Sequence, residues 1–587
     1  MHKQKFGIVL ITIFLSLFFL VMAIGYTISY SPGVFPDEFA HMAYIIDVMN
    51  KGFPDYASGI IFSSFKLNYL NHPALYYLIV GKLVSFFHFQ YMYADVGRYL
   101  NILISIFIII LTCKMLFSTT QSVMATFIGG AFLITIPMFV VSGSAVSNDQ
   151  INVFGCTLVV YGLLKLMDDH KENKILTSSI ISICFGGVIA SLSKATGSLA
   201  IVCLLTSVAF FNFLTIVKIV KKVTLIQWMI ILSSLAIVII YFTYIYGAYG
   251  KFYPAPQSNP AIWFAIDNPG AKIFDLSEFV VKFFQANFVT LTVPYGHAPI
   301  ADIEIRVVIL KLILVIISGM TCFVIIKRMS CNDIHYKILF SFVVAYVFFI
   351  IIYLYTIRQL HVDTGYMGAM QARYFFGFLP VYSLVIAKVI TAINSKVSRL
   401  IVFVIIMSGL VASLYPALIR LSDFHTLKAL TVVEQPQYNI NYGDLTKGRK
   451  FEQVIIAESN SIRGVELMLA TFARRNHGVL ALDLSNQTGQ VIYRSTVRLD
   501  SLRDNAYAWF DFHHTPLIRN GKYILSLRCD ECTNINTITW WAAKKEYEPP
   551  VFLFTRFGPG AVSLYPKGNA YVDGKDVGGA FAFRLYF

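Results

Sequence analysis

The stretch FGIVLITIFLSLFFLVMAIGYTI, residues 6–28, is continuously apolar and follows a short basic start. A helix needs about 20 apolar residues to cross a hydrocarbon core of about 30 Å. This run is too long for the apolar region of a signal peptide and lacks a small-residue cleavage site. We therefore predict a retained transmembrane helix.

The rest of the chain repeats this pattern, because 57% of the 587 residues are apolar and only 13% are charged. This composition is typical of a polytopic membrane protein. Counting residues 6–28, the sequence predicts eleven spans: 6–28, 99–117, 121–141, 150–167, 175–192, 197–216, 224–246, 305–326, 336–356, 372–391 and 399–418.

The loop charges predict the orientation, since Lys and Arg near helix ends are retained in the cytoplasm. With a cytoplasmic N-terminus, the inner segments carry 15 Lys and Arg against 4 acids, and the outer segments carry 11 against 12. Most of the net charge of +15 therefore reflects topology rather than nucleic-acid binding. The inner segments are the N-terminus, 113–121, 165–174, 218–222, 327–337 and 388–399, and the outer ones are 30–98, 142–149, 193–196, 247–306 and 357–373.

The chain changes character after residue 420. We predict a membrane domain over 1–420, a linker over 421–442 and an exported β-sandwich or jelly roll over 443–587. Apolar-polar alternation between turn signals supports this prediction. The expected strands are 464–473, 478–484, 490–499, 522–527, 537–542 and 580–587.

Two features of this domain allow alternatives. Its aromatic side chains would either stack on sugar rings or fill the core. Cys529 and Cys532 favour a local disulfide over a zinc site, for which no second cysteine pair is present. The aromatic residues are Tyr507, Trp509, Phe510, Trp540 and Trp541.

The strongest candidate for chemistry is the segment PDEFAH, residues 36–41, just beyond the first span. Asp37 could cap a helix over 38–49, a purely structural role for one acid. A cap does not explain the adjacent Glu38, or His41 one turn on. We expect one acid to take a proton while the other orients a neighbour.

A second outer segment begins NHPALYY at residue 71. Its apolar stretch is short and is followed by Asp95 and Arg98. A span here would also move every later loop to the side of the membrane that its charges do not favour. We predict an interfacial helix on the outer face, with His72 either facing the cavity of Asp37 or serving as a polar helix start.

These motifs resemble the GT-C superfamily of polyprenyl-phosphate-sugar-dependent glycosyltransferases. More closely, PDEFAH, Val-Ser-Asn-Asp at 146–149, Lys-Ala-Thr-Gly at 194–197 and Gln-Ala-Arg-Tyr-Phe at 371–375 resemble, in this order, the bacterial membrane-protein family DUF2142. The resemblance covers roughly residues 1–420.

The resemblance implies a GT-C-like fold and transfer of a sugar from a polyprenyl phosphate to an acceptor hydroxyl, with inversion. Asp37 is then the general base and Glu38 a helper that positions the acceptor or Asp37. Arg373 and Lys194 would stabilise the departing phosphate, with snorkelling to lipid headgroups as the alternative role.

Other polar residues at the outer helix ends are supporting candidates. Asn148 and Asp149 would face Asp37, or would cap the following helix. Arg358 and His361 lie in the last outer loop and are weaker candidates. No cofactor is required. A divalent metal would be compatible with Asp37, Glu38 and Asp149, but the sequence does not demand one.

The outer loop 247–303 is rich in proline and aromatic residues, so we expect irregular backbone that closes over a substrate. The expected partners are a polyprenyl-phosphate sugar, a glycan or lipid-linked glycan acceptor such as lipopolysaccharide O-antigen, and membrane lipids, with no nucleic acid. The expected location is the bacterial inner membrane, with the β domain in the periplasm. The first alternative is transfer or polymerisation of a whole oligosaccharide. The second is transport of a lipid-linked sugar, which predicts more polar residues at mid-membrane than this sequence has.

Overall fold

The structure is a computed structural model, and part of the chain lies outside its description. It describes residues 2–29, 35, 37–54, 72–87, 93–252, 261, 265, 270–292, 334–368, 370–393, 395–397, 399–411, 432–435, 438, 440–472, 474, 476–502, 504, 506–544, 565 and 568–587. The predicted span 305–326 falls outside these residues, and so do residues 293–303 and most of 253–269 in the predicted outer loop 247–303.

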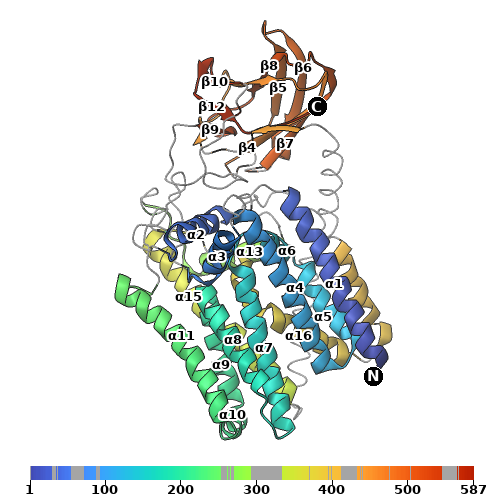
Figure 1. The fold of residues 1–587 in the computed structure, drawn as a ribbon, viewed down its shortest axis with the longest axis vertical. Coiled ribbons are helices and arrows are strands. Elements are labelled where there is room, and N and C mark those ends of the chain that lie inside the picture. Colours follow the sequence, from blue (N-terminus) through green and yellow to red (C-terminus); the bar gives the residue numbers. More distant parts are fainter. Residues whose placement is uncertain are drawn as a thin grey trace.

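Among the described residues before 412, most are helical, and these helices form one bundle (Figure 1). Their bounds are α1 His2–Ser29, α2 Glu38–Lys51, α3 Leu75–Phe86, α4 Tyr93–Thr120, α5 Val123–Thr135, α6 Pro137–Ser144, α7 Asp149–Lys171, α8 Thr177–Ser193, α9 Ala195–Phe211, α10 Phe213–Val220, α11 Leu225–Tyr249, α13 Leu276–Thr292, α15 Ile334–Thr364, the 3₁₀ helix η2 Ala372–Phe378, α16 Leu379–Ala392 and a last helix Arg399–Val411.

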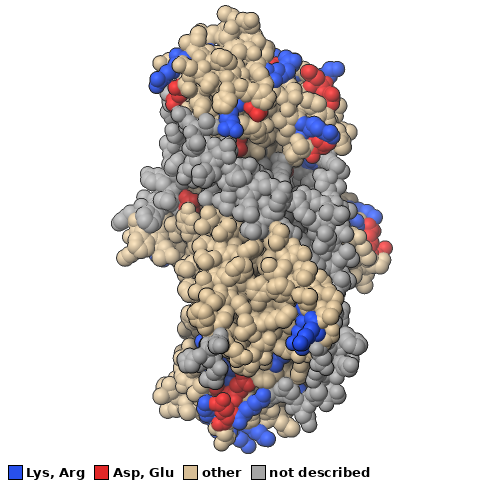
Figure 2. All heavy atoms as spheres, turned by 90° about the vertical axis from the view of Figure 1, so that its right-hand side faces the viewer, with Lys and Arg blue, Asp and Glu red and all other residues tan. Residues whose placement is uncertain are grey.

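Six of the described helices are long and apolar enough to cross a membrane, and up to eight if each of two bent pairs counts as one span. The chain is therefore a multi-pass helical membrane protein. Ten of the eleven predicted spans coincide with described helices, among which α8 has 17 residues. In Figure 2, charged side chains gather at the two ends of the visible face, and few interrupt the helical body between them.

Two predicted spans are bent. The span expected over 121–141 breaks between α5 and α6 by 66°. Pro137 explains this break, because proline has no N–H to donate and its ring displaces the preceding turn. The span expected over 197–216 ends at Phe211, where α9 and α10 meet at 98°. The Asn212 side chain occupies this corner and bonds the Val208 carbonyl and Ser341 Oγ.

The segments predicted to face outward contain more helix than their prolines suggested. The expectation of irregular backbone over 247–303 is wrong for residues 276–292, which form α13. Prolines flank this stretch at 269 and 294 but do not interrupt it, so the backbone N–H groups of the helix remain available. The expected short helices over 38–49 and after His72 are present as α2 and α3.

The C-terminal part is a two-sheet β domain with a shared apolar core. One sheet has the order β1-β13-β4-β9-β12, with β2 beside β9 and β7 beside β4, and the other has the order β11-β10-β3-β8-β5-β6. The strands are β1 Val432–Gln435, β2 Ile440–Asn441, β3 Phe451–Ile456, β4 Ser461–Ala470, β5 Val479–Asn486, β6 Val491–Arg498, β7 Ala506–Pro516, β8 Lys522–Arg528, β9 Thr539–Lys544, β10 Ala570–Val572, β11 Lys575–Asp576, β12 Gly579–Phe581 and β13 Phe583–Tyr586.

Strands β1 and β2 correct the expected linker over 421–442, because both pair within the first sheet. Phe510 and Trp540 are fully buried in the core, and the Trp540 indole N–H donates to the Ala582 carbonyl at 2.8 Å. Core filling therefore explains these two residues. Cys529 and Cys532 form a disulfide.

The β domain lies over the end of the bundle that carries α2 and α3 (Figure 1). Residues of both parts share one buried cluster, which we call the interdomain cluster. From the β domain it includes Tyr438, Met468, Ala470, Trp541 and Ala582, and from α2 and α3 it includes Met42, Tyr44, Tyr76, Tyr77 and Val80.

Candidate active site

Four charged side chains from distant parts of the sequence meet in a buried group that we call the charge cluster: Asp37, Asp149, Lys194 and Arg373. Arg373 Nη1 lies 3.4 Å from Asp149 Oδ2, and its Nη2 donates to Asp37 Oδ2. Lys194 Nζ donates to Asp149 Oδ1. Two acids and two bases make the cluster formally neutral, as buried charges require. All four are site residues expected from the sequence.

Each member stands at an element end on the side of the bundle nearest the β domain. Asp37 precedes α2, Asp149 begins α7, Lys194 joins α8 to α9 and Arg373 lies in η2. Gly197 allows the start of α9 to pack closely here, because a Cβ on it would collide with the Asn152 side chain and the Ala190 carbonyl. The Lys-Ala-Thr-Gly motif therefore has a packing reason for its glycine.

The capping role considered for the acids is not the one their side chains play. Asp37 stands at the N-cap of α2 but makes no side-chain cap hydrogen bond. Asn148 is the N-cap of α7 and also lacks a side-chain cap bond. The carboxylates of Asp37 and Asp149 instead pair with cations of the charge cluster.

Exposure differs sharply within the cluster. The Asp37 side chain is 15% exposed, whereas those of Asp149, Lys194 and Arg373 are 0%, 3% and 4% exposed. Tyr374 covers the two cations, with its ring centroid 4.6 Å from Lys194 Nζ and 5.7 Å from Arg373 Cζ. Asp37 is thus the member most accessible to an incoming group.

Glu38 pairs with Arg98, which is not a member of the charge cluster. Its carboxylate accepts two hydrogen bonds from Arg98, at 2.7 and 2.8 Å, and is fully buried. Direct contact with an acceptor, one role expected for Glu38, does not fit this burial, whereas support of Asp37 does. In the sequence, Arg98 counts only as a charge before the predicted span 99–117, and its pairing with Glu38 is not predicted. In the structure, Arg98 lies in the second turn of α4, where an intramembrane arginine is a recognisable signal of function.

Two histidines, one in α2 and one just before α3, lie beside the cluster. His41 Nδ1 is 2.7 Å from the Tyr77 hydroxyl, and the His41 and His72 rings are 6.1 Å apart. Burial, assisted by the positive charge of Lys194, lowers the pKa of His72 to about 3. Burial also lowers the pKa of His41 well below its usual value. Both rings are therefore neutral at physiological pH.

The remaining candidate residues, Asn148, Arg358 and His361, make contacts that stabilise the fold around the site. The Asn148 side chain donates to the Ser193 carbonyl at 2.7 Å, beside Lys194. His361 Nε2 accepts from the Phe274 N–H at 3.0 Å, and Arg358 lies over the ring of Phe279. The prediction that Arg358 and His361 lie in a loop is wrong, because both belong to the last turns of α15, where they contact Phe279 and Phe274.

The acids considered for a divalent metal have cationic partners in this structure. Among the described residues, no three His, Cys, Asp or Glu side chains group closely enough to hold an ion. Of the acids considered for one, Asp37 and Asp149 pair with Arg373, and Glu38 pairs with Arg98.

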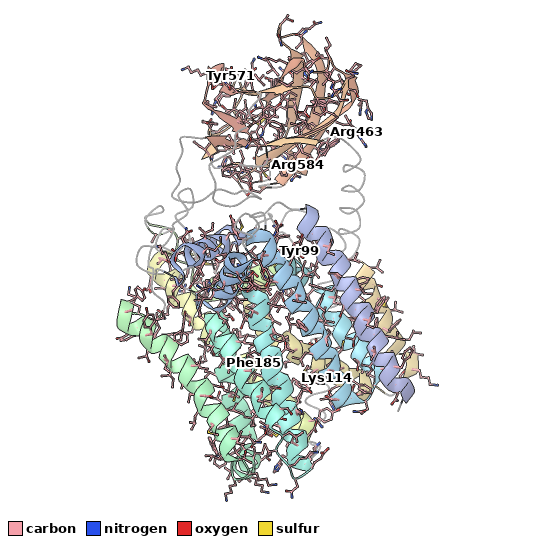
Figure 3. All side chains as sticks on the ribbon, in the orientation of Figure 1. Tyr99, Lys114, Phe185, Arg463, Tyr571 and Arg584 are labelled. Atoms are coloured by element: carbon pink, nitrogen blue, oxygen red, sulfur yellow. A yellow bond between two sulfur atoms is a disulfide. The ribbon has the colours of Figure 1, made fainter. Side chains whose placement is uncertain are left out.

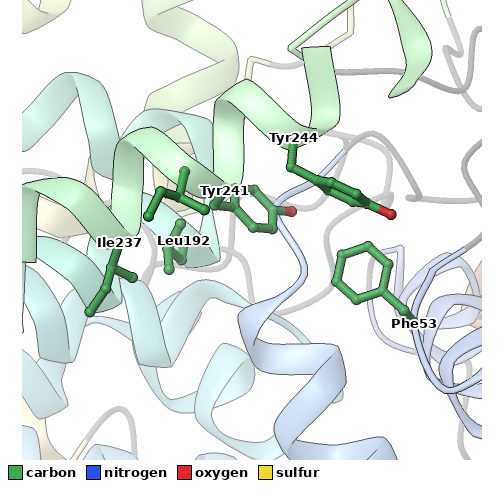
Figure 4. Close-up of a pocket in the computed structure, with 6 residues that line it drawn as sticks. Phe53, Leu192, Ile237, Tyr241 and Tyr244 are labelled. Atoms are coloured by element: carbon green, nitrogen blue, oxygen red, sulfur yellow. The ribbon is translucent and has the colours of Figure 1, made fainter. Parts of the chain in front are cut away.

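An apolar pocket of about 410 Å³ lies between α11, α8 and the residues after α2 (Figure 4). Leu192, two residues before Lys194, forms one wall. The hydroxyl of Tyr241 accepts from the Ala74 N–H at 3.0 Å, which joins α11 to the start of α3 close to His72. Its other lining residues are Phe53, Ile237, Ile240 and Tyr244.

Comparison with family models and with curated protein sequences finds no match, so the DUF2142 resemblance stays a prediction. Among solved structures, ArnT from Cupriavidus metallidurans bound to undecaprenyl phosphate aligns at 12% identity and a TM-score of 0.42, over 67% of this chain and 62% of that one. The apo structure of the same enzyme aligns at 12% identity and a TM-score of 0.43, over 68% and 62%. Less than two thirds of the ArnT chain is covered.

Proposed function

We propose that this chain is a GT-C-type glycosyltransferase that moves a sugar from a polyprenyl phosphate to a hydroxyl of a cell-surface glycan, such as an O-antigen-type lipopolysaccharide acceptor, on the outer face of the bacterial inner membrane. The observation that carries the proposal is the charge cluster, in which a partly exposed carboxylate and a buried arginine share one contact. The motif order of the sequence supports the same reaction class.

In this reaction, Asp37 takes the proton of the acceptor hydroxyl as that oxygen bonds to the anomeric carbon. The bond from the anomeric carbon to the phosphate oxygen breaks, and the polyprenyl phosphate leaves as an anion. The configuration inverts because the acceptor attacks opposite the leaving group. Asp37 suits the base because it is the most exposed acid of the cluster and its side chain is not engaged in capping.

Arg373 and Lys194 suit the departing phosphate. A guanidinium presents two parallel N–H donors to an anion, and the low-polarity surroundings strengthen each contact. Arg373 already bonds Asp37 and Asp149, so an arriving phosphate would compete for it. Donor binding would thereby release the Asp37 carboxylate for the acceptor.

The apolar pocket suits the lipid part of the donor. Its walls are aliphatic and aromatic. One of its lining residues, Leu192, is two residues before Lys194 in the sequence. Isoprenoid units would lie against Ile237 and Tyr241 while the phosphate reaches the cations.

The test is transfer by the purified full chain in detergent, offered radiolabelled polyprenyl-phosphate sugars and a membrane glycan extract. Asp37→Asn should lower transfer by about 10²-fold or more, since general bases contribute about 10²–10⁴-fold. Arg373→Ala should also lose transfer. Asp168→Asn, at the opposite end of α7, is the matched acid-to-amide control and should transfer normally.

Each preparation is first compared with the wild type by thermal unfolding, so that a misfolded variant is not scored. Undiminished transfer by folded Asp37→Asn would exclude Asp37 as the base. The mass of the product separates addition of one sugar from transfer of a whole oligosaccharide.

A further inference from the structure

Arg98 and Glu38 form a buried ion pair outside the charge cluster. Arg98 Nε and Nη2 donate to the two oxygens of Glu38 at 2.7 and 2.8 Å. Their side chains are 1% and 0% exposed. Tyr99, the neighbour of Arg98, marks the end of α4 nearest the β domain, and Lys114 lies farther along the helix (Figure 3).

The same pair joins segments that carry the site acids. Val146 lies three residues before Asp149, and its N–H donates to Glu38 Oε1 at 2.8 Å. Glu38 itself directly follows Asp37. One carboxylate thus connects the backbone beside both acids, and Arg98 Nη1 adds the Thr27 carbonyl of α1 at 3.2 Å.

Asn101 supports the turn before α7 from the same helix. Its Nδ2 donates to the carbonyls of Ala145 and Ser147, at 2.7 and 2.8 Å. Arg98 and Asn101 are three residues apart and therefore lie on one face of α4. This face of α4 holds the turn through both a carboxylate and an amide.

Stability alone does not account for such a pair. Removing two charges from water is costly, and an apolar pair of similar volume often gives an equally stable protein. A bidentate pair does supply a defined geometry. We infer that Arg98 is a positioning residue: it holds Glu38, and through Glu38 it sets the separation of Asp37 and Asp149 around Arg373. Only the catalytic consequence of this inference rests on the proposed function.

The positional part is tested without activity. In the full chain in detergent, the rate at which a water-soluble carbodiimide modifies Asp37 is measured by mass spectrometry. The double variant Glu38→Gln with Arg98→Met removes both charges and keeps similar volumes. We expect it to fold and its Asp37 to react several-fold faster than in the wild type.

Lys388→Met is the matched control, because Lys388 is also a buried cation and donates to the Thr119 carbonyl at 2.8 Å, at the other end of α4. It should leave the Asp37 rate unchanged. Equal rates in the wild type and the folded double variant would overturn the inference, and so would the same acceleration in Lys388→Met. The single variant Arg98→Met would leave the buried Glu38 carboxylate without its cation and so could fail to fold. The inference is therefore tested with the double variant.

The catalytic part is tested with the donor and acceptor used for the wild type. The double variant should lower kcat by about tenfold or more, since small misplacements of reacting groups are that costly, while KM for the lipid donor stays within about twofold. Arg98→Lys keeps the positive charge beside Glu38 but not the two parallel hydrogen bonds, so its kcat should lie between those of the double variant and the wild type. An unchanged kcat in the double variant would overturn this part. Absence of transfer by the wild type would count against the proposed function, and the modification rates would still decide the position of Asp37.

Discussion

Asp37 has a backbone conformation that few residues with a side chain adopt, with φ 60° and ψ 4°. The left-handed region costs an L residue about 1–2 kcal/mol, and aspartate is among the residues that tolerate it best. The Asp37 carbonyl accepts from the Ala40 and His41 N–H groups at 3.0 and 3.2 Å, so the helix begins in spite of this cost. A strained residue whose carboxylate pairs with a buried arginine is typical of a functional site.

His72 gives a prediction on pH at the residue scale. Its pKa is about 3 in the folded chain and about 6.5 when unfolded, so the unfolded state binds more protons between these values. Stability is therefore fully present above pH 6.5 and falls as the pH drops toward 3, by at most about 1.4 kcal/mol per pH unit for this residue. His72→Gln should flatten the decline of the melting temperature in detergent between pH 6.5 and 5.

His41 contributes a decline of the same sign, because its pKa is also lowered, so the slope should shrink in His72→Gln without vanishing. An unaltered slope would show that His72 is accessible to protons in the folded chain. His477, an exposed residue in the turn before β5, provides the control substitution His477→Gln, which should leave the slope unchanged.

At the scale of elements, the crossing of α7 and α8 determines where two members of the charge cluster meet. Gly155 and Gly186 lie at this crossing, and a Cβ on Gly155 would come within 2.7 Å of the Gly186 carbonyl oxygen. Small residues allow such close approach between membrane helices. Asp149 begins α7 and Lys194 follows the end of α8, so the helix separation bears directly on their contact.

Gly186→Ala should therefore both destabilise the bundle and impair the site. A Cβ on Gly186 would lie 2.7 Å from Leu158 Cβ, closer than side-chain carbons pack. We expect a loss of about 1–3 kcal/mol, as for other overpacked positions, and a lower transfer rate. Gly187→Ala is the neighbouring control, because its Cβ would meet only Ile201 Cγ2, at 4.0 Å. Similar melting temperatures for the two variants would contradict this account of the crossing.

Local patterns in the sequence predicted most elements. The expected strands 478–484 and 490–499 are β5 and β6, because alternation and turn residues are local signals. The same signals did not predict β3 or β7, and continuous hydrophobicity over 121–141 hid the break at Pro137. Hydrophobicity measures where a chain avoids water, and it carries little information on where a helix bends.

The charge cluster was predictable as a set of residues but not as a set of contacts. Each acid or base stands at a helix end on the side that the loop charges predict to face outward. The pairing of Glu38 with Arg98, 60 positions apart, depends on how α2 packs against α4. Long-range packing of this kind leaves no mark in a single sequence.

At the scale of the whole molecule, the β domain covers the end of the bundle that carries the site. The interdomain cluster places Tyr438 and Trp541 in one apolar group with Tyr44 and Tyr77. Tyr77 in turn contacts His41 beside the charge cluster. The β domain is thereby joined to the site through two layers of side chains.

The orientation of this assembly in the membrane gives the last prediction. Arg498, in β6, is 76% exposed, and Lys174, in the turn between α7 and α8, is 51% exposed at the other end of the molecule. Because basic turns are retained in the cytoplasm, a membrane-impermeant maleimide added to intact spheroplasts should label Arg498→Cys directly and Lys174→Cys only after permeabilisation. The unsubstituted chain measures the background labelling of its other cysteines, of which Cys113, Cys156 and Cys203 are buried and Cys184 is partly exposed. The reverse order of labelling would place the charge cluster on the cytoplasmic side, where soluble nucleotide sugars are available, and would remove the reason for a lipid-linked donor.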